Sequence, residues 1–178
     1  RKVVVAGVGM HPCGTWKDKE TSEIALTAVL NALDDSGVPF KDIDAVYCSH
    51  VAPAASLAEV ICEKIGLTGV PMLNVENACA SGSTAIREAW LAVANGVYDI
   101  ALVIGVEKIS GIGVLGGAGD KGNLDMLLGM NIMPSLYALM ANEHMHKYGT
   151  TKEQLALVGV KNKRNGVLNP YAHIRKEF

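Results

Sequence analysis

The sequence lacks any excess of positive charge and any long apolar run. It has 16 Lys and Arg against 18 Asp and Glu, a net charge of -2, and aromatic side chains make up only 5% of it. A protein that binds nucleic acid through its phosphates usually carries a basic excess. A segment that spans a bilayer needs about 20 consecutive apolar residues. We therefore expect no nucleic-acid partner and no membrane partner.

Cysteine is also scarce, and its spacing excludes two further classes of protein. The four cysteines, Cys13, Cys48, Cys62 and Cys79, form no CxxC pair, so a disulfide framework and a zinc knuckle are not expected. We expect no metal site. The first residues, "RKVVVAGVGM", are too short for a signal peptide with its cleavage site. We expect a cytoplasmic protein, with a peroxisomal address at a more distant C-terminus left open.

Strand-like and helix-like segments alternate over the first 110 residues. Residues 2–9 are a β-branched run typical of a strand buried on both faces. Further strands are expected at residues 44–51, 70–75 and 98–107, separated by helices at residues 21–37, 57–66 and 83–96. Such alternation predicts βαβ units and an α/β fold with a mostly parallel sheet.

Particular residues are expected to bound these helices and to pack them. Thr21 or Ser22 can cap the start of the first helix, and Gly37 its end. In the third helix, Trp90 shares a helical face with Ile86 and Val93, which predicts an apolar stripe turned toward the core.

The character of the chain changes after Ser110. "GIGVLGGAGDKGN" is rich in glycine and has few groups that could build a core. Two helices are expected beyond it, at residues 134–149 with proline at the start, and at residues 151–166 with a threonine cap. The chain then ends at "NPYAHIRKEF" without a capped element.

The stretch "VPMLNVENACASGSTAIREAWLAVANG" predicts a strand, an abrupt turn and a helix, with Cys79 at the turn. The amide groups and the dipole at a helix start stabilise a thiolate, and such placement lowers the pKa of a thiol. The neighbours Ala78, Ala80, Ser81 and Gly82 are small and leave room for a substrate. Cysteine is also among the most often buried residues, and a buried cysteine is usually inert. From spacing alone, both interpretations stay open.

Several stretches together resemble one family. "NACASGSTA" resembles the nucleophile segment of the thiolase superfamily, "MHPCG" a family turn with three departures, and "IGVEKIS" the segment after the fourth strand. "EHMHKYGTTKEQLALVGVKNKRNGVLNPYA" resembles the sterol-carrier-protein or lipid-transfer-protein type of thiolase. The resemblance covers essentially the whole chain.

What the resemblance implies is the N-terminal half of a layered αβαβα thiolase fold. Residues 1–110 would form the core half, and residues 111–178 the start of an inserted loop region, which shapes the CoA and acyl pockets, with the helices that follow. The C-terminal half of such a fold is absent from the chain. In the family, that half carries the histidine that activates the nucleophile and a second cysteine.

The resemblance also implies a chemistry and a set of partners. Cys79 would carry an acyl group during acyl transfer between CoA thioesters in lipid metabolism, as thiolytic cleavage or Claisen condensation of a 3-ketoacyl-CoA. Asn77, Ser81 and Gly82 would hold the turn, and the N–H of Cys79 would face the oxyanion. The CoA thioester is substrate, and no tightly bound cofactor is expected. A homodimer and a small partner with a zinc ribbon and an OB-fold are family implications.

Three alternatives remain beside this interpretation. A β-ketoacyl synthase uses the same turn cysteine with a different set of histidines, and the Ser-Gly after Cys79-Ala80 and the "NPYA" region favour a thiolase over it. A thiolase-like aldolase lacks the nucleophilic cysteine, so the presence of Cys79 counts against it. The third is a non-catalytic half that serves as a scaffold or dimerisation unit. No local histidine is expected to act as the base; the candidates are His11, His50, His144, His146 and His173.

Overall fold

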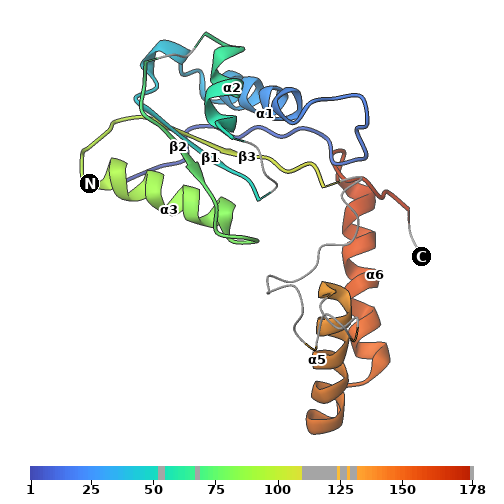
Figure 1. Cartoon of the computed structure of the whole chain (residues 1–178). Helices are drawn as coiled ribbons and strands as arrows, with labels where there is room; N and C mark the ends of the chain where they lie inside the picture. The colour runs from blue at the N-terminus through green and yellow to red at the C-terminus, as the bar shows by residue number, and fades with distance from the viewer. Residues whose placement is uncertain (52–54, 67–68, 110–123, 125–127, 129–131, 177–178) are drawn as a thin grey trace. The chain divides into compact units, whose positions relative to one another are not determined.

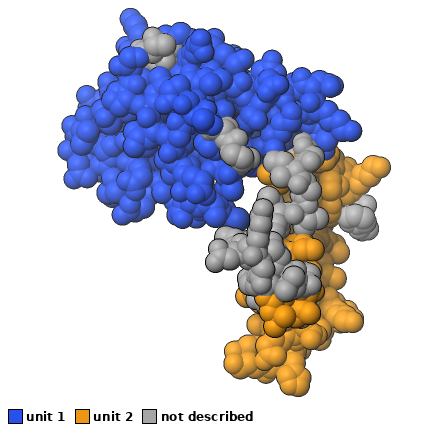
Figure 2. All heavy atoms as spheres, viewed as in Figure 1, with its two compact units in different colours: residues 1–108 blue, residues 109–178 orange. Residues whose placement is uncertain are grey.

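The computed structural model describes residues 1–51, 55–66, 69–109, 124, 128 and 132–176. The chain divides into two compact units, Arg1–Lys108 and Ile109–Phe178 (Figure 2). The first unit holds a sheet and its covering helices, and the described residues of the second lie mainly in two helices (Figure 1).

The sheet of the first unit has three parallel strands in the order β2-β1-β3. The strands are β1 (Ala45–Ser49), β2 (Met72–Val75) and β3 (Ala101–Gly105). Ser49, the last residue of β1, pairs with Val75 on one side and Gly105 on the other. The carboxyl ends of all three strands therefore meet at one edge, as the predicted βαβ units require.

Helices cover both faces of this sheet. α1 (Thr21–Ser36) and α2 (Leu57–Glu63) lie on one face, and α3 (Ser81–Ala94) lies on the other (Figure 1). A short 3₁₀ helix, η1 (Phe40–Asp42), leads into β1. The predicted α/β architecture is confirmed.

Two apolar clusters hold the layers together, one on each side of the sheet. Val46 and Cys48 of β1 pack with Ile61 and Cys62 of α2 in one cluster, which also includes α1 and β3 residues. Ala45 and Tyr47, the alternate residues of β1, pack with α3 in the other. The strand is buried on both faces because its side chains alternate between the two helical layers.

The strand expected at residues 2–9 is wrong. The segment forms no strand, and Val5 is 82% exposed. β1 and β3 pair directly with each other, so residues 2–9 lie outside the sheet, along α1. Gly7 and Gly9 allow this, because a Cβ at Gly9 would lie 2.0 Å from the Ala28 carbonyl oxygen.

Two details of the helices also differ from the prediction. α1 begins after Glu20, whose amide donates to the Glu23 carboxylate, so neither Thr21 nor Ser22 is the cap. The expected core stripe of α3 is wrong as well, because Trp90 is 52% exposed. α3 instead turns its small residues toward the sheet, where their size lets the helix approach closely; these are Ser81, Ala85 and Ala89.

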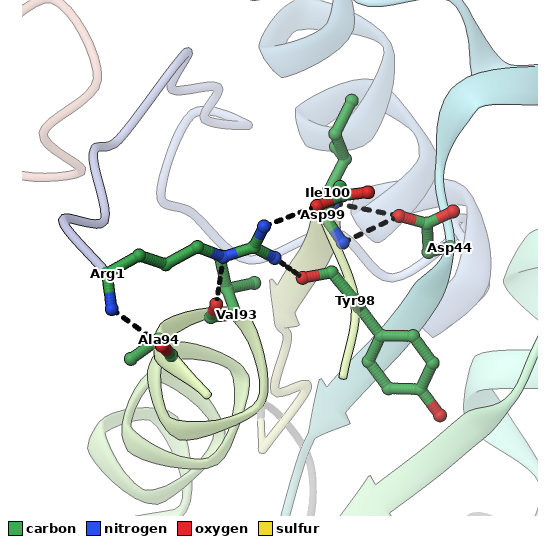
Figure 3. Close-up of polar contacts among 7 residues, drawn as sticks. All are labelled: Arg1, Asp44, Val93, Ala94, Tyr98, Asp99 and Ile100. Atoms are coloured by element: carbon green, nitrogen blue, oxygen red, sulfur yellow. Dashed lines mark hydrogen bonds and ion pairs between the residues drawn. The ribbon is translucent and has the colours of Figure 1, made fainter. Parts of the chain in front are cut away.

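A polar clamp fixes the start of β1 to the loop before β3 (Figure 3). The Asp44 carboxylate accepts hydrogen bonds from the amides of Asp99 and Ile100, each 2.9 Å long. These two bonds lower the pKa of Asp44 below its ordinary value of 3.8. The Arg1 guanidinium binds the Asp99 carboxylate and the Tyr98 carbonyl in the same loop. Arg1 also donates to the Val93 and Ala94 carbonyls at the end of α3. The clamp therefore ties the end of α3 and the loop before β3 to the start of β1.

The second unit contains α5 (Met133–Tyr148) and α6 (Lys152–Leu168). Both helices begin as predicted: Pro134 lies in the first turn of α5, and the Thr151 hydroxyl accepts the Gln154 amide at the start of α6. The predicted glycine-rich stretch 111–123 lies outside the described residues. None of the helices in the described part of the chain is long and apolar enough to cross a membrane.

Candidate active site

The turn between β2 and α3 presents Cys79 at the carboxyl edge of the sheet. β2 ends at Val75 and α3 begins at Ser81, so five residues reverse the chain. Cys79 directly precedes Ala80, the N-cap of α3, and is exposed. Ala78 before it has a positive φ of 46°, a conformation that side chains other than glycine rarely adopt. The sharp strand-turn-helix path predicted around Cys79 is present.

Ser81 holds this turn from inside. Its side chain is only 4% exposed, and its hydroxyl accepts the Asn77 amide at 2.8 Å and donates to the Ala78 carbonyl at 2.7 Å. The Asn77 side chain in turn donates to the Thr84 hydroxyl at 3.0 Å. The structure thus brings two of the predicted turn residues, Asn77 and Ser81, into one hydrogen-bonded network around Cys79.

Gly82 lies at the junction of α3 with β1. A Cβ added there would lie 3.8 Å from the Ser49 hydroxyl oxygen, an ordinary contact. A Cβ added at Gly105, the last residue of β3, would lie closer to the same oxygen, at 3.3 Å. The start of α3 therefore packs on the ends of β1 and β3, and the space at Gly82 alone does not require a glycine.

The start of α3 favours a negative charge at the position of Cys79. The N-cap Ala80 has no side chain that could bind the first-turn amides, and the first turn carries no acidic residue. The amides of Ala80 and Ser81 are bonded to the carbonyls of Asn77 and Ala78, and the dipole of a helix start stabilises an anion placed there. A thiolate formed at Cys79 would lie beside this helix start.

The other thiols differ from Cys79 in their surroundings. Cys48 and Cys62 are buried in the apolar cluster between the sheet and α2. Burial raises the pKa of Cys48 to about 12 and also raises the pKa of Cys62. Cys13 is exposed. Since a thiolate is the nucleophilic form, the buried pair is inert at neutral pH.

The histidines fall into different surroundings. His50 follows β1, and its amide donates to the Val75 carbonyl at 3.4 Å, so it lies at the strand edge from which the Cys79 turn begins. His11 is buried, with Nδ1 at 2.8 Å from the Pro12 carbonyl and Nε2 at 2.9 Å from Lys19. His144 contacts Thr150 in the second unit. Among the described residues, no group of three or more His, Cys, Asp or Glu could hold a metal ion.

Sequence reasoning missed two residues of the turn network. The Glu76 carboxylate accepts a hydrogen bond from the Ala78 amide at 2.6 Å. The Thr84 hydroxyl accepts one from the Asn77 side chain. The recurring pairing of a side chain with the amide two residues later is made by the shorter Asp, Asn, Ser and Thr, so the spacing of Glu76 gave no such signal. The partner of Asn77 depends on how α3 leaves the turn, and spacing alone does not give that.

Comparison with known proteins shows the family of the chain. The family model described as "Thiolase, N-terminal domain" matches residues 3–178. The chain belongs to the thiolase family. An acetyl-CoA acetyltransferase of Methanothermobacter thermautotrophicus is 38% identical over 97% of the chain, and human sterol carrier protein 2 is 33% identical over all of it.

Solved structures show the same thiolase fold. An acetyl-CoA acetyltransferase from Syntrophomonas wolfei matches 92% of the chain with a TM-score of 0.69 and 26% identity. A structure titled "Ltp2-ChsH2(DUF35) aldolase" matches 94% of the chain with a TM-score of 0.77 and 22% identity. The chain spans 47% of the archaeal relative and 35% of the human one.

Proposed function

We propose that this thiolase-family chain supplies the nucleophile for acyl transfer between acyl-CoA thioesters. The observation that carries the proposal is the placement of Cys79, an exposed thiol directly before the uncapped start of α3. The archaeal relative named acetyl-CoA acetyltransferase supports the choice of substrate class. The CoA thioester is a substrate, and the proposal involves no tightly bound cofactor.

The first half of the reaction loads an acyl group onto Cys79. The Cys79 thiolate attacks the carbonyl carbon of an acyl-CoA, and the electron pair of the carbonyl moves to its oxygen. The amide of Cys79 and the first turn of α3 stabilise this oxyanion. The oxyanion collapses, the bond from the carbonyl carbon to the CoA sulfur breaks, and CoA leaves as a thiolate that takes up a proton.

The second half transfers the acyl group onward. The α-carbanion of a second acyl-CoA attacks the acyl-Cys79 carbonyl, a carbon–carbon bond forms, and the Cys79 thiolate leaves. Thiolytic cleavage of a 3-ketoacyl-CoA is the reverse of this sequence. Asn77 and Ser81 keep Cys79 in place during both halves through their hydrogen bonds. The proposal assigns no residue of the chain to the removal of the thiol proton or of the α-carbon proton, and acyl loading itself needs only the thiolate form of Cys79.

Partners and compartment belong to the proposal as well. We propose a homodimer formed through the strand before the nucleophile, which is β2. β2 is an edge strand in the order β2-β1-β3, and Leu73 on it is exposed. The Ltp2–ChsH2(DUF35) structure motivates a small partner protein with a zinc ribbon and an OB-fold. A cytoplasmic location completes the proposal.

Exchange of label between CoA and acetyl-CoA tests the first half alone, because it needs only acyl loading and return. We expect exchange with the purified chain and none with Cys79→Ala. Cys13→Ala is the matched control, since Cys13 is also an exposed thiol but lies outside the turn.

Other outcomes of the exchange experiment favour the alternatives to the proposed acyl transfer. Absence of exchange with a folded chain in which Cys79 still reacts with iodoacetamide favours the non-catalytic scaffold. Exchange with an acyl carrier protein in place of CoA favours the β-ketoacyl synthase alternative. Exchange that survives Cys79→Ala contradicts the proposed nucleophile.

A further inference from the structure

We propose that Glu76 is a positioning residue for Cys79. Its carboxylate holds the Ala78 amide and thereby fixes the left-handed turn that presents the thiol to α3. The inference rests on the proposed function for its relevance to acyl transfer, but the geometry it invokes is independent of any substrate.

The contact itself is short and directed. Glu76 Oε1 lies 2.6 Å from the Ala78 nitrogen, and a bond between an ionised acceptor and an amide is stronger than a neutral one. Glu76 follows the last residue of β2, Val75. The sheet therefore fixes the backbone that carries this carboxylate.

Ala78 is the residue in the turn that most needs such support. Its φ is 46°, and only Ser56 shares a positive φ among the non-glycine residues that the structure describes. An L-amino acid in this region places its Cβ near backbone oxygen, so the conformation persists only where the surroundings hold it.

Glu76 and Ser81 hold Ala78 from its two sides. Glu76 accepts the amide of the peptide before Ala78, and Ser81 donates to the carbonyl of the peptide after it. Fixing both peptide planes fixes both φ and ψ of Ala78. Hydrogen bonds from the Ala80 amide to the Asn77 carbonyl and from the Ser81 amide to the Ala78 carbonyl, each 3.0 Å long, hold the same two peptides from the helix side. The Glu76 carboxylate is the contact that holds the Ala78 amide, and it thereby helps to set the direction of the next residue, Cys79.

The negative charge of Glu76 does not favour a thiolate at Cys79, so the proposed effect of Glu76 on Cys79 is geometric. A carboxylate near Cys79 opposes a thiolate electrostatically. Glu76 is exposed, so water screens much of this repulsion. Removing the acceptor and removing the charge therefore have opposite expected effects on the reactivity of Cys79, which makes the two roles separable.

Three variants separate them. Glu76→Ala removes both acceptor and charge, whereas Glu76→Gln keeps an oxygen acceptor at the same reach without the charge. Glu63→Ala removes an exposed carboxylate at the end of α2 and serves as the matched control. Reaction of Cys79 with iodoacetamide is followed on the tryptic peptide 65–87, which contains no other cysteine, between about pH 6 and 9.

We expect Glu76→Ala to slow alkylation of Cys79 by about tenfold at neutral pH. Glu76→Gln should react at least half as fast as the unmodified chain, and Glu63→Ala should match it. In CoA exchange, Glu76→Ala should lower the maximal rate at an unchanged half-saturating acetyl-CoA concentration. Equal or faster alkylation in both Glu76 variants would overturn the inference, since charge alone would then explain the effect.

A second measurement needs no variant and so does not depend on how a variant folds. The NMR shift of the Ala78 amide should follow the titration of the Glu76 carboxyl in the unmodified chain. An Ala78 amide that does not respond would overturn the inference. Loss of exchange with retained Glu76 effects on alkylation would instead contradict the proposed function and leave the positioning role intact.

Discussion

The Ser81 hydroxyl lies 2.8 Å from the amide nitrogen of Asn77, four residues earlier, and 2.7 Å from the carbonyl oxygen of Ala78. One buried hydroxyl thus joins two residues of the turn, Asn77 and Ala78, to the first residue of α3. Cys79 lies within the loop that this hydroxyl closes. The arrangement predicts that the reactivity of Cys79 depends on a side chain that touches no substrate.

Replacing Ser81 with alanine should loosen the turn. The Asn77 amide would lose its acceptor, and we expect acyl exchange with acetyl-CoA to fall by about tenfold, the effect of one hydrogen bond near 1 kcal/mol or slightly more. Ser83→Ala is the matched control, because the Ser83 hydroxyl is exposed and bonds only to the Ala80 carbonyl. Equal rates for the two variants would show that Ser81 does not position the thiol.

The thiols should divide into two reactivity classes. At neutral pH, iodoacetamide should modify the two exposed cysteines, Cys13 and Cys79, and spare Cys48 and Cys62. Because the pKa of Cys48 is raised to about 12 by burial, raising the pH to about 9 should not expose it to reaction. Unfolding in urea should make Cys48 reactive toward iodoacetamide. Fragmentation mass spectrometry of the tryptic peptides measures each site, since Cys48 and Cys62 share the peptide 42–64, and rapid native modification of Cys48 would contradict the packing of β1 against α2.

The Asp44 clamp predicts a pH-dependent contribution to stability. Its pKa is lowered in the folded chain, so the contribution is present above the ordinary value of 3.8 and is lost as the pH falls through the folded-state pKa. Asp44→Asn should destabilise the chain by about 1 kcal/mol at neutral pH, and by less near pH 3.

Urea unfolding at the two pH values measures this difference. Asp42→Asn, at the neighbouring exposed carboxylate of η1, controls for loss of charge alone. A deficit for Asp44→Asn that is equal at both pH values would mean that the ionised carboxylate is not what binds the Asp99 and Ile100 amides.

The two faces of α3 should respond differently to mutation. Ala89→Leu adds volume where α3 packs closely on the sheet and should destabilise the chain by about 1–3 kcal/mol. Trp90→Ala, one residue further, removes a side chain that is 52% exposed and should change the unfolding free energy by less than about 1 kcal/mol. A reversed order, measured by thermal or urea unfolding, would mean that Trp90 is a core residue after all.

Local chemistry in the sequence predicted much of this structure. The start of α5 follows from Pro134, its end from Gly149, and the start of α6 from Thr151. A proline, an αL glycine and a capping hydroxyl each fix the backbone within one turn. Cys79 at a strand-to-helix turn was predictable for the same reason. The small residues beside it permit a close reversal of the chain.

What depends on tertiary pairing was not predictable. A β-branched run predicts a strand, but whether residues 2–9 enter the sheet depends on which strands pair, and β1 pairs with β3 directly. Helical periodicity could not decide which face of α3 is buried, since Trp90 and Ala89 are neighbours and the close approach to the sheet selects the smaller residue. The Glu76 and Thr84 contacts depend on the turn that they stabilise.

The most direct test of the proposed nucleophile is the intact mass of the 18.8 kDa chain before and after incubation with acetyl-CoA, followed by mapping of the modified peptide. We expect one added acetyl group, located on the tryptic peptide 65–87, and none in Cys79→Ala. An acetyl group on any other peptide, or one that persists in Cys79→Ala, would contradict the assignment of Cys79 as the residue that carries the acyl group.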